Sequence, residues 1–184
     1  MTKSSKASAK VGIIGGSGLY SSDHIKNPRE LRLTTPFGAH SGPIVVGELE
    51  GVPCAFLPRH GKGHVYTPTE LPQRANMWAL KSLGVERVLA FSAGGSLKEE
   101  LPPRTFVFPD QLVDRTKDRV QTFFGGGLVA HVAFNPPFAP EQNRIVFNAA
   151  KELGIKSVFG GTYCCMEGPA FSTKAESEMH RACG

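Results

Sequence analysis

The chain has 184 residues, of which 40% are hydrophobic and 20% charged, a balance that is typical of globular proteins and excludes an intrinsically disordered one. The formal net charge is +5, but three of the lysines lie within the first ten residues, so the charge is only weak evidence for nucleic-acid binding and suits a small anionic substrate equally well. No run of about 18 apolar residues occurs, so no membrane-spanning helix is predicted.

The first ten residues are polar and basic and contain no apolar stretch. They therefore lack the central feature of a secretory signal, and we expect residues 1–10 to form a disordered tail. No linker or internal repeat follows. A single domain is expected over residues 11–184.

The first predicted strand, residues 11–14, opens into the glycine-rich loop 15–18. A dinucleotide-binding fingerprint would need a third glycine and an acid about twenty residues further on, and both are absent. A serine hydrolase elbow would need a glycine where Leu19 stands. Two interpretations remain: an anion-binding nest of backbone N–H groups with the hydroxyl of Ser17, or a plain tight turn.

Strands are next predicted at residues 44–48 and 53–57, and Arg59 and His60 follow the second of them directly. Arginine presents a planar fork that matches phosphate, and histidine can donate to a phosphate oxygen. His60 and His64 have the spacing of two zinc ligands on a helix, but two of the three residues between them are glycine. A metal site is therefore weakly supported, and an ordinary solvated turn is the simpler alternative.

A helix is predicted over residues 71–83, with Pro72 in its first turn and Gly84 at its end. The strand at 86–91 follows and ends in the small residues Ser92-Ala93-Gly94-Gly95-Ser96. This is the third predicted strand that is followed directly by groups able to bind an anion. Because ligands of open α/β sheets bind beyond the carboxyl ends of the strands, we expect these three ends to converge on one crevice.

The remaining elements alternate in the same way, which predicts the α/β class. Strands are expected at 105–109 and 157–163, and helices from Pro140 to Gly154 and over 173–184, the last opening with the capping box Thr173-x-x-Glu176. Residues 110–139 are glycine-rich and predicted to be irregular. Loops of that length in a compact domain are often functional or lie at an interface.

The four cysteines show no CxxC spacing, and Cys164 and Cys165 would point to opposite faces of a strand. This pattern disfavours a disulfide framework and a zinc site, and favours reduced thiols in an intracellular protein.

Phe171 lies between the Glu167-Gly168-Pro169 turn and the last helix, where it either joins the core or lies at the crevice mouth and stacks on a base. The segments GGSGLY, PRHGKGH, SAGGSL and EGPAFSTKAES occur in this order. Together they resemble the nucleoside phosphorylase superfamily, and within it the methylthioadenosine branch, from about residue 10 to the end of the chain.

This resemblance implies a single-domain phosphorylase/hydrolase-like fold, in which helices flank a twisted mixed sheet. It also implies phosphorolysis of 5′-methylthioadenosine to adenine and 5-methylthioribose 1-phosphate, with inorganic phosphate as co-substrate and no cofactor or metal. The residues that it implies for phosphate binding are Ser17, Arg59, His60, Ser92 and Ala93.

On the nucleoside side, the resemblance implies that Phe171 packs on the purine and that Ser172 suits a 6-aminopurine, whereas the 6-oxopurine enzymes carry Glu at that position. His64 would lie near the sugar. His131 would reach into the site of a neighbouring subunit, which implies a homotrimer. Neither nucleic acid nor a membrane is an expected partner, and the expected location is the cytoplasm, with the nucleus as a second compartment.

Two departures from the family pattern bear on activity. Ala170 stands where many relatives carry a larger polar or basic residue, and no Asp follows Asp118. The family's acid at the purine would lie beyond Gly184, so we expect a domain that is incomplete at its C-terminus, with little activity of its own. Two alternatives stay open: a purine nucleoside phosphorylase of other specificity, and a catalytically inactive binding protein.

Overall fold

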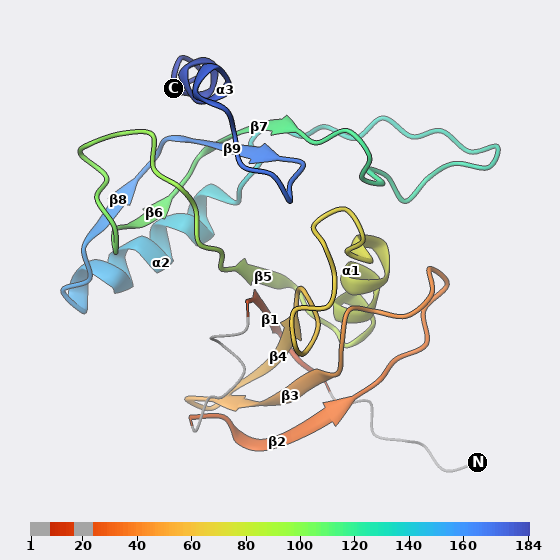
Figure 1. Ribbon diagram of the computed structural model, residues 1–184. Helices are drawn as coiled ribbons and strands as arrows, with labels where there is room; N and C mark the ends of the chain where they lie inside the picture. Colours follow the sequence, from red (N-terminus) through yellow and green to blue (C-terminus); the bar gives the residue numbers. More distant parts are fainter. Residues whose placement is uncertain (1–7, 17–23) are drawn as a thin grey trace, which may run out of the picture. The chain divides into compact units, whose positions relative to one another are not determined.

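The computed structural model describes residues 8–16 and 24–184 (Figure 1). It divides into two compact units: unit 1 is Met1–Ala93 with Val120–Phe123, and unit 2 is Gly94–Arg119 with Phe124–Gly184. The expected single domain over 11–184 stays a prediction. The mixture of sheets and helices confirms the α/β class.

Unit 1 is built on a five-stranded mixed sheet in the order β2-β3-β4-β1-β5. Its elements are β1 (Val11–Gly15), β2 (Lys26–Leu31), β3 (Ile44–Leu49), β4 (Val52–Pro58), α1 (Gln73–Ser82) and β5 (Arg87–Ala90). β1 pairs in parallel with both β4 and β5, whereas β3 is antiparallel to β2 and β4. The carboxyl ends of β1, β4 and β5 therefore lie at the same edge of the sheet.

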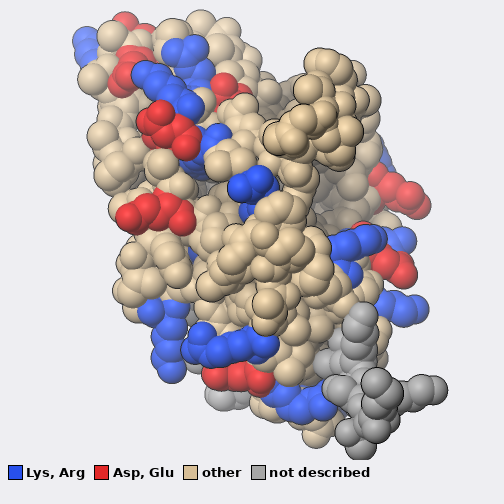
Figure 2. Space-filling view, turned by 90° about the vertical axis from the view of Figure 1, so that its right-hand side faces the viewer, with Lys and Arg blue, Asp and Glu red and all other residues tan. Residues whose placement is uncertain are grey.

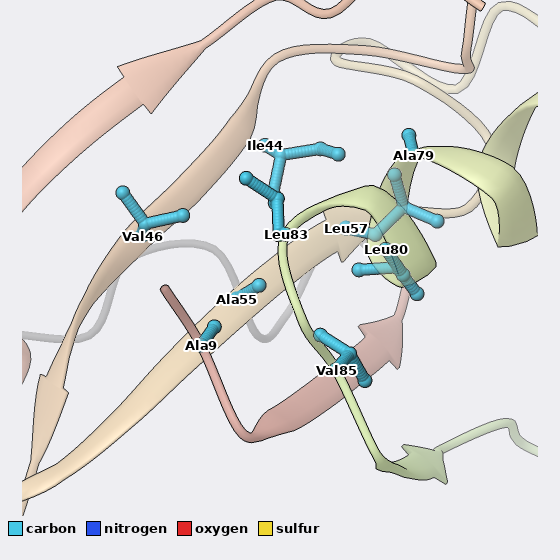
Figure 3. Close-up of a cluster of buried hydrophobic side chains, with 9 residues drawn as sticks. All are labelled: Ala9, Ile44, Val46, Ala55, Leu57, Ala79, Leu80, Leu83 and Val85. Atoms are coloured by element: carbon cyan, nitrogen blue, oxygen red, sulfur yellow. The ribbon is translucent and has the colours of Figure 1, made fainter. Parts of the chain in front are cut away.

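One apolar cluster holds the sheet of unit 1 against α1 (Figure 3). Its members come from β3, β4, α1 and the segments beside them, and they are Ala9, Ile44, Val46, Ala55, Leu57, Ala79, Leu80, Leu83 and Val85. Ala9 is only 1% exposed, and the backbone of Lys10 bonds to Pro53 and Glu86. The packed chain thus begins before the boundary that was expected at residue 11, while residues 1–7 of the expected tail lie outside the described part.

Unit 2 contains two pairs of parallel strands. β6 (Phe106–Phe108) pairs with β8 (Ser157–Phe159), and β7 (Gln111–Arg115) pairs with β9 (Thr162–Met166). The helices are α2 (Pro140–Glu152) and α3 (Lys174–Arg181). Thr173 caps α3 through both bonds of the predicted capping box: its hydroxyl accepts from the N–H of Glu176, and its own N–H donates to the carboxylate of Glu176.

Three details differ from the sequence-based prediction. The single strand expected at 157–163 is two strands, because Gly160 and Gly161 adopt positive φ and interrupt it. Residues 110–139 are not irregular throughout, since β7 lies within them. β2 was not predicted, because its residues, KNPREL, are mostly polar and exposed and contain no apolar run.

No helix in residues 8–16 or 24–184 is long and apolar enough to cross a membrane. On the face drawn in Figure 2, basic and acidic side chains are interspersed. The positive formal charge of the chain is therefore not gathered into one patch on that face.

Candidate functional site

Arg59 directly follows the last residue of β4, and backbone hydrogen bonds place it beside the ends of β1 and β5. Its N–H donates to the carbonyl of Gly15 over 3.1 Å, and the N–H of Phe91 donates to the carbonyl of Ile14 over 2.8 Å. The guanidinium Nη1 of Arg59 then reaches the carbonyl of Phe91 at 3.2 Å. The parallel pairing of the three strands is what brings these residues together, although they are far apart in sequence.

Hydrogen bonds from residues outside β4 hold the turn that contains Arg59. The carbonyl of Pro58 accepts from the hydroxyl of Ser41 and from the N–H of Gly61. The N–H of Ser41 in turn donates to Oδ1 of Asn76, a side chain of α1 that is 2% exposed. Gly61 has φ +73°, and a Cβ there would lie 2.8 Å from the carbonyl of Ser41. Only glycine fits this position without strain, because other residues rarely adopt this φ and their Cβ would clash with that carbonyl.

The hydrogen bonds of His60 determine its tautomer. Its Nδ1 lies 3.0 Å from the carbonyl of Tyr66, which can only accept, so Nδ1 carries a proton. Its Nε2 lies 3.2 Å from Nε of Arg59, which can only donate, so Nε2 is the acceptor. The ring of His64 stacks on that of His60, with centroids 4.2 Å apart and planes at 10°. In this state His60 orients Arg59 and does not itself present a donor to a ligand.

This arrangement can bind an anion. Within the described residues, Nη2 of Arg59 has no protein partner, and Ser92 and Ala93 follow Phe91 directly and are exposed. Ser17, the remaining candidate, lies outside the described residues. The structure thus brings Arg59 and His60 to the end of β5. Phosphate binding by these residues stays a prediction.

The predicted nucleoside residues of unit 2 lie between β9 and α3 and in the long loop before α2. Phe171 is 91% exposed, so it is not a core residue of the described structure. The hydroxyl of Ser172 lies 3.3 Å from Nδ1 of the buried His180 on α3. His131 is exposed, and so is the nearby ring of Phe134.

Sequence reasoning missed a pair of charged residues in unit 2. Arg119 forms an ion pair with Glu167, which had been noted from the sequence only as part of the Glu167-Gly168-Pro169 turn. The carboxylate of Glu167 accepts from the N–H groups of Lys117 and Asp118 as well. Because both its oxygens accept hydrogen bonds, this group is arranged as an acceptor and not as a proton donor. The sequence signal that could have pointed to Arg119 was its position in a long loop that was expected to be functional.

The cysteines and histidines do not form a metal centre within the described residues: no group of three or more side chains that could hold a metal ion occurs there. All four cysteines are free. Burial raises the pKa of Cys54 and also that of Cys164 above the ordinary thiol value. A raised pKa reduces the thiolate fraction, so neither group is arranged as a nucleophile.

Residues 10–184 match the family model described as "Phosphorylase superfamily". The chain is 56% identical over 176 residues to an S-methyl-5'-thioadenosine phosphorylase of Koribacter versatilis, covering 96% of this chain and 60% of that protein. It is 53% identical to the protein of the same name from Pyrococcus abyssi, covering 94% of this chain and 66% of that protein.

Solved structures give the same result. A methylthioadenosine phosphorylase from an antarctic soil metagenomic library matches with a TM-score of 0.92 and 49% identity, over 96% of this chain and 63% of that chain. Methylthioadenosine phosphorylase from Schistosoma mansoni in its apo form matches with a TM-score of 0.90 and 39% identity, over 96% and 70% of the two chains. The chain spans about three-fifths of the length of the curated relatives it matches.

Proposed function

The chain belongs to the phosphorylase superfamily, and from that premise we propose that the protein cleaves the N-glycosidic bond of 5′-methylthioadenosine with inorganic phosphate. The products would be adenine and 5-methylthioribose 1-phosphate. The observation that carries the proposal is the position of Arg59, held by His60 and Phe91 at the shared end of parallel strands. The names of the relatives supply the nucleoside.

Phosphate would have two tasks in this reaction. Positive charge develops on the ribose in an oxocarbenium-like transition state, and a phosphate oriented against the anomeric carbon supplies both the nucleophile and compensating negative charge. Arg59 would orient the phosphate through the donors of Nη2, with Ser17, Ser92 and Ala93 providing further hydrogen bonds and His60 holding the guanidinium. Because the phosphate itself supplies the charge, the step needs neither a covalent enzyme intermediate nor a metal.

In unit 2, Phe171 would pack on the purine, and Ser172 would contact its edge. The exposed ring of Phe171 supports this role, since an aromatic ring that has no packing partner in its own unit is available to stack on a base. His64 would lie near the sugar. All four cysteines are free, which supports a reducing compartment, the cytoplasm or nucleus.

The proposal is tested by following adenine release from 5′-methylthioadenosine with and without phosphate. Two proteins are needed: the chain of 184 residues, and an extended chain in which residue 184 is followed by the C-terminal remainder of the 56% identical relative. We expect phosphate-dependent release from the extended chain and little from the shorter one. The resemblance places the residue that protonates the leaving purine beyond Gly184, and such protonation contributes about 10²–10⁴-fold to the rate. An extended chain that binds the nucleoside but releases no adenine would support the inactive binding protein instead.

Specificity is tested at Ser172. In the extended chain, Ser172→Glu should shift preference from methylthioadenosine toward methylthioinosine, because a carboxylate accepts from the N1–H that only the 6-oxopurine presents. Ser177→Glu, a neighbouring serine on α3, is the control. An unchanged ratio of the two specificity constants would show that the base is recognised elsewhere.

Assembly is tested by light scattering on the extended chain, for which we propose a homotrimer. The exposed apolar residues beside His131, among them Val129 at 79% and Val132 at 73%, favour cover by a neighbouring subunit. We expect His131→Ala to raise KM for methylthioadenosine in the oligomer. An extended chain that is fully active as a monomer would contradict a site shared between subunits.

A further inference from the structure

Hydrogen bonds connect the turn after β7 with the end of β9 in unit 2, and each of the two segments supplies a side chain that bonds to the backbone of the other. Arg119 donates from Nη2 to the carbonyls of Met166 at 2.7 Å and Glu167 at 2.6 Å. Its Nε lies 3.4 Å from Oε1 of Glu167, and its Nη1 lies 3.7 Å from Sγ of Cys165. In return, Oε2 of Glu167 accepts from the N–H groups of Lys117 and Asp118.

The Arg119–Glu167 pair differs from the other ion pairs of the described chain in its burial. Its side chains are 17% and 20% exposed, whereas those of the Lys174–Glu178 pair are 92% and 60% exposed. Exposed pairs contribute little to stability, and a half-buried arginine that contacts two backbone carbonyls is held far more tightly. A lysine could not replace it, because one ammonium cannot reproduce the fork that reaches both carbonyls and the carboxylate.

The segment that follows Glu167 contains the residues proposed to contact the purine. Residues 168–172 connect β9 to α3, with Glu167 at one end and the capping residue Thr173 at the other (Figure 1). Ser172 is further held near His180. Phe171, in contrast, is 91% exposed, so packing within unit 2 does not determine the direction of its ring. The backbone of residues 168–172 determines where its Cα–Cβ bond lies, and Arg119 anchors one end of that backbone.

From these contacts, and resting on the proposed function, we infer that Arg119 is a positioning residue for purine recognition: with Glu167, it sets the path of residues 168–172 and thereby the placement of Phe171 and Ser172. Arg119 itself touches neither phosphate nor purine in this assignment. Its loss should therefore weaken use of the nucleoside and leave use of phosphate unchanged, because the proposed phosphate residues all belong to unit 1.

The kinetic test compares Arg119→Ala, Arg119→Lys and the control Arg115→Ala in the extended chain, Arg115 being an exposed arginine at the end of β7. We expect KM for methylthioadenosine to rise roughly ten- to a hundredfold in both Arg119 variants, with KM for phosphate unchanged. Added guanidinium should partly restore Arg119→Ala and not Arg119→Lys, whose ammonium fills the space. Equal changes in both KM values, or none, would overturn the inference.

A second measurement does not depend on activity, so a failure of the proposed function is distinguishable from a failure of this inference. Amide hydrogen exchange of the 184-residue chain should quicken in residues 166–173 of Arg119→Ala and remain unchanged there in Arg115→Ala. Unchanged exchange in that segment would overturn the inference even if the extended chain is fully active. Faster exchange would show that Arg119 anchors residues 168–172 even if the extended chain releases no adenine, in which case the proposed function fails and the anchoring stands.

Discussion

Unit 1 buries the apolar sides of its sheet and of α1 in shared clusters, whereas unit 2 leaves most of its large apolar side chains exposed. Leu80 on α1 is 1% exposed, while Leu153 at the end of α2 is 76% exposed. Among the buried hydrophobic residues of the described chain, Ala150 is the one that belongs to unit 2. Hydrophobic burial therefore stabilises unit 1 much more than unit 2.

This contrast shows two ways of holding functional residues in place. In unit 1, Arg59 follows a strand of a packed sheet, and Ser41 links its turn to the buried Asn76. In unit 2, Phe171 lies in a segment whose two ends are held in place by hydrogen bonds and an ion pair. The proposed phosphate contacts thus depend on the core, and the proposed purine contacts depend on polar contacts near the surface.

The largest expected effect comes from two leucines that test the difference in burial directly. Leu80→Ala should lower the free energy of unfolding by about 2–5 kcal/mol, because it leaves a cavity beside α1. Leu153→Ala should change it by less than about 0.5 kcal/mol, because the side chain is already in water. Urea unfolding followed by circular dichroism measures both, and equal losses would mean that unit 2 is packed as tightly as unit 1.

The next largest effect concerns the anion site of unit 1. Arg59→Ala should weaken phosphate binding by about 2–4 kcal/mol, because a charge-assisted contact from a half-buried group is lost. Calorimetric titration of the folded variant measures this, with Arg87→Ala on β5, an arginine that is 66% exposed, as the control. If Arg59→Ala binds phosphate with unaltered affinity, the assignment of the site to these strand ends is wrong.

Thiol labelling extends the comparison to chemical reactivity. Cys54 on β4 is 3% exposed and burial raises its pKa, while Cys183 after α3 is exposed. At neutral pH, Cys183 should react with a maleimide at least about tenfold faster than Cys54, because reaction needs both access and a thiolate. Peptide mass mapping at short times measures the ratio, and the variant Leu80→Ala should reduce it by loosening the core. Comparable rates in the unaltered chain would show that the reagent reaches Cys54 as easily as the exposed Cys183, and therefore that the core of unit 1 opens readily.

The smallest effect tests the local bonds that unit 2 uses in place of a core. Thr173→Ala should destabilise α3 by about 1 kcal/mol, through loss of the cap. Hydrogen bonds from the backbone N–H and the side chain of Thr173 lower the pKa of the Glu176 carboxyl, so the contribution of these bonds is present above the ordinary carboxyl pKa and is lost as the pH falls through the lowered value. Because the backbone N–H remains in Thr173→Ala, the helical circular dichroism signal, followed from pH 7 downward, should keep part of this dependence in Thr173→Ala and lose it in Glu176→Gln, with Ser177→Ala as the unaltered control. A pH dependence that survives in Glu176→Gln would assign it to another group.

The amino-acid sequence by itself determined the elements whose signals are local. Apolar runs predicted β1, β3, β4 and β5, and helical spacing with capping residues predicted the three helices, because each pattern lies within one short stretch of chain. β2 escaped prediction, since an edge strand with exposed polar residues carries no such pattern. The family was also recognisable from four ordered motifs, and the match over residues 10–184 confirms it.

Tertiary structure alone decided the contacts between distant residues. The tautomer of His60 depends on the carbonyl of Tyr66, and the position of Arg59 depends on Phe91, 32 residues away. The bond from Lys117 to Glu167 spans 50 residues of sequence, and the β7 strand that leads to it was taken for irregular chain. Periodicity and turn residues report only on nearby neighbours, whereas such a pair forms because the parallel pairing of β7 with β9 brings the two strand ends together.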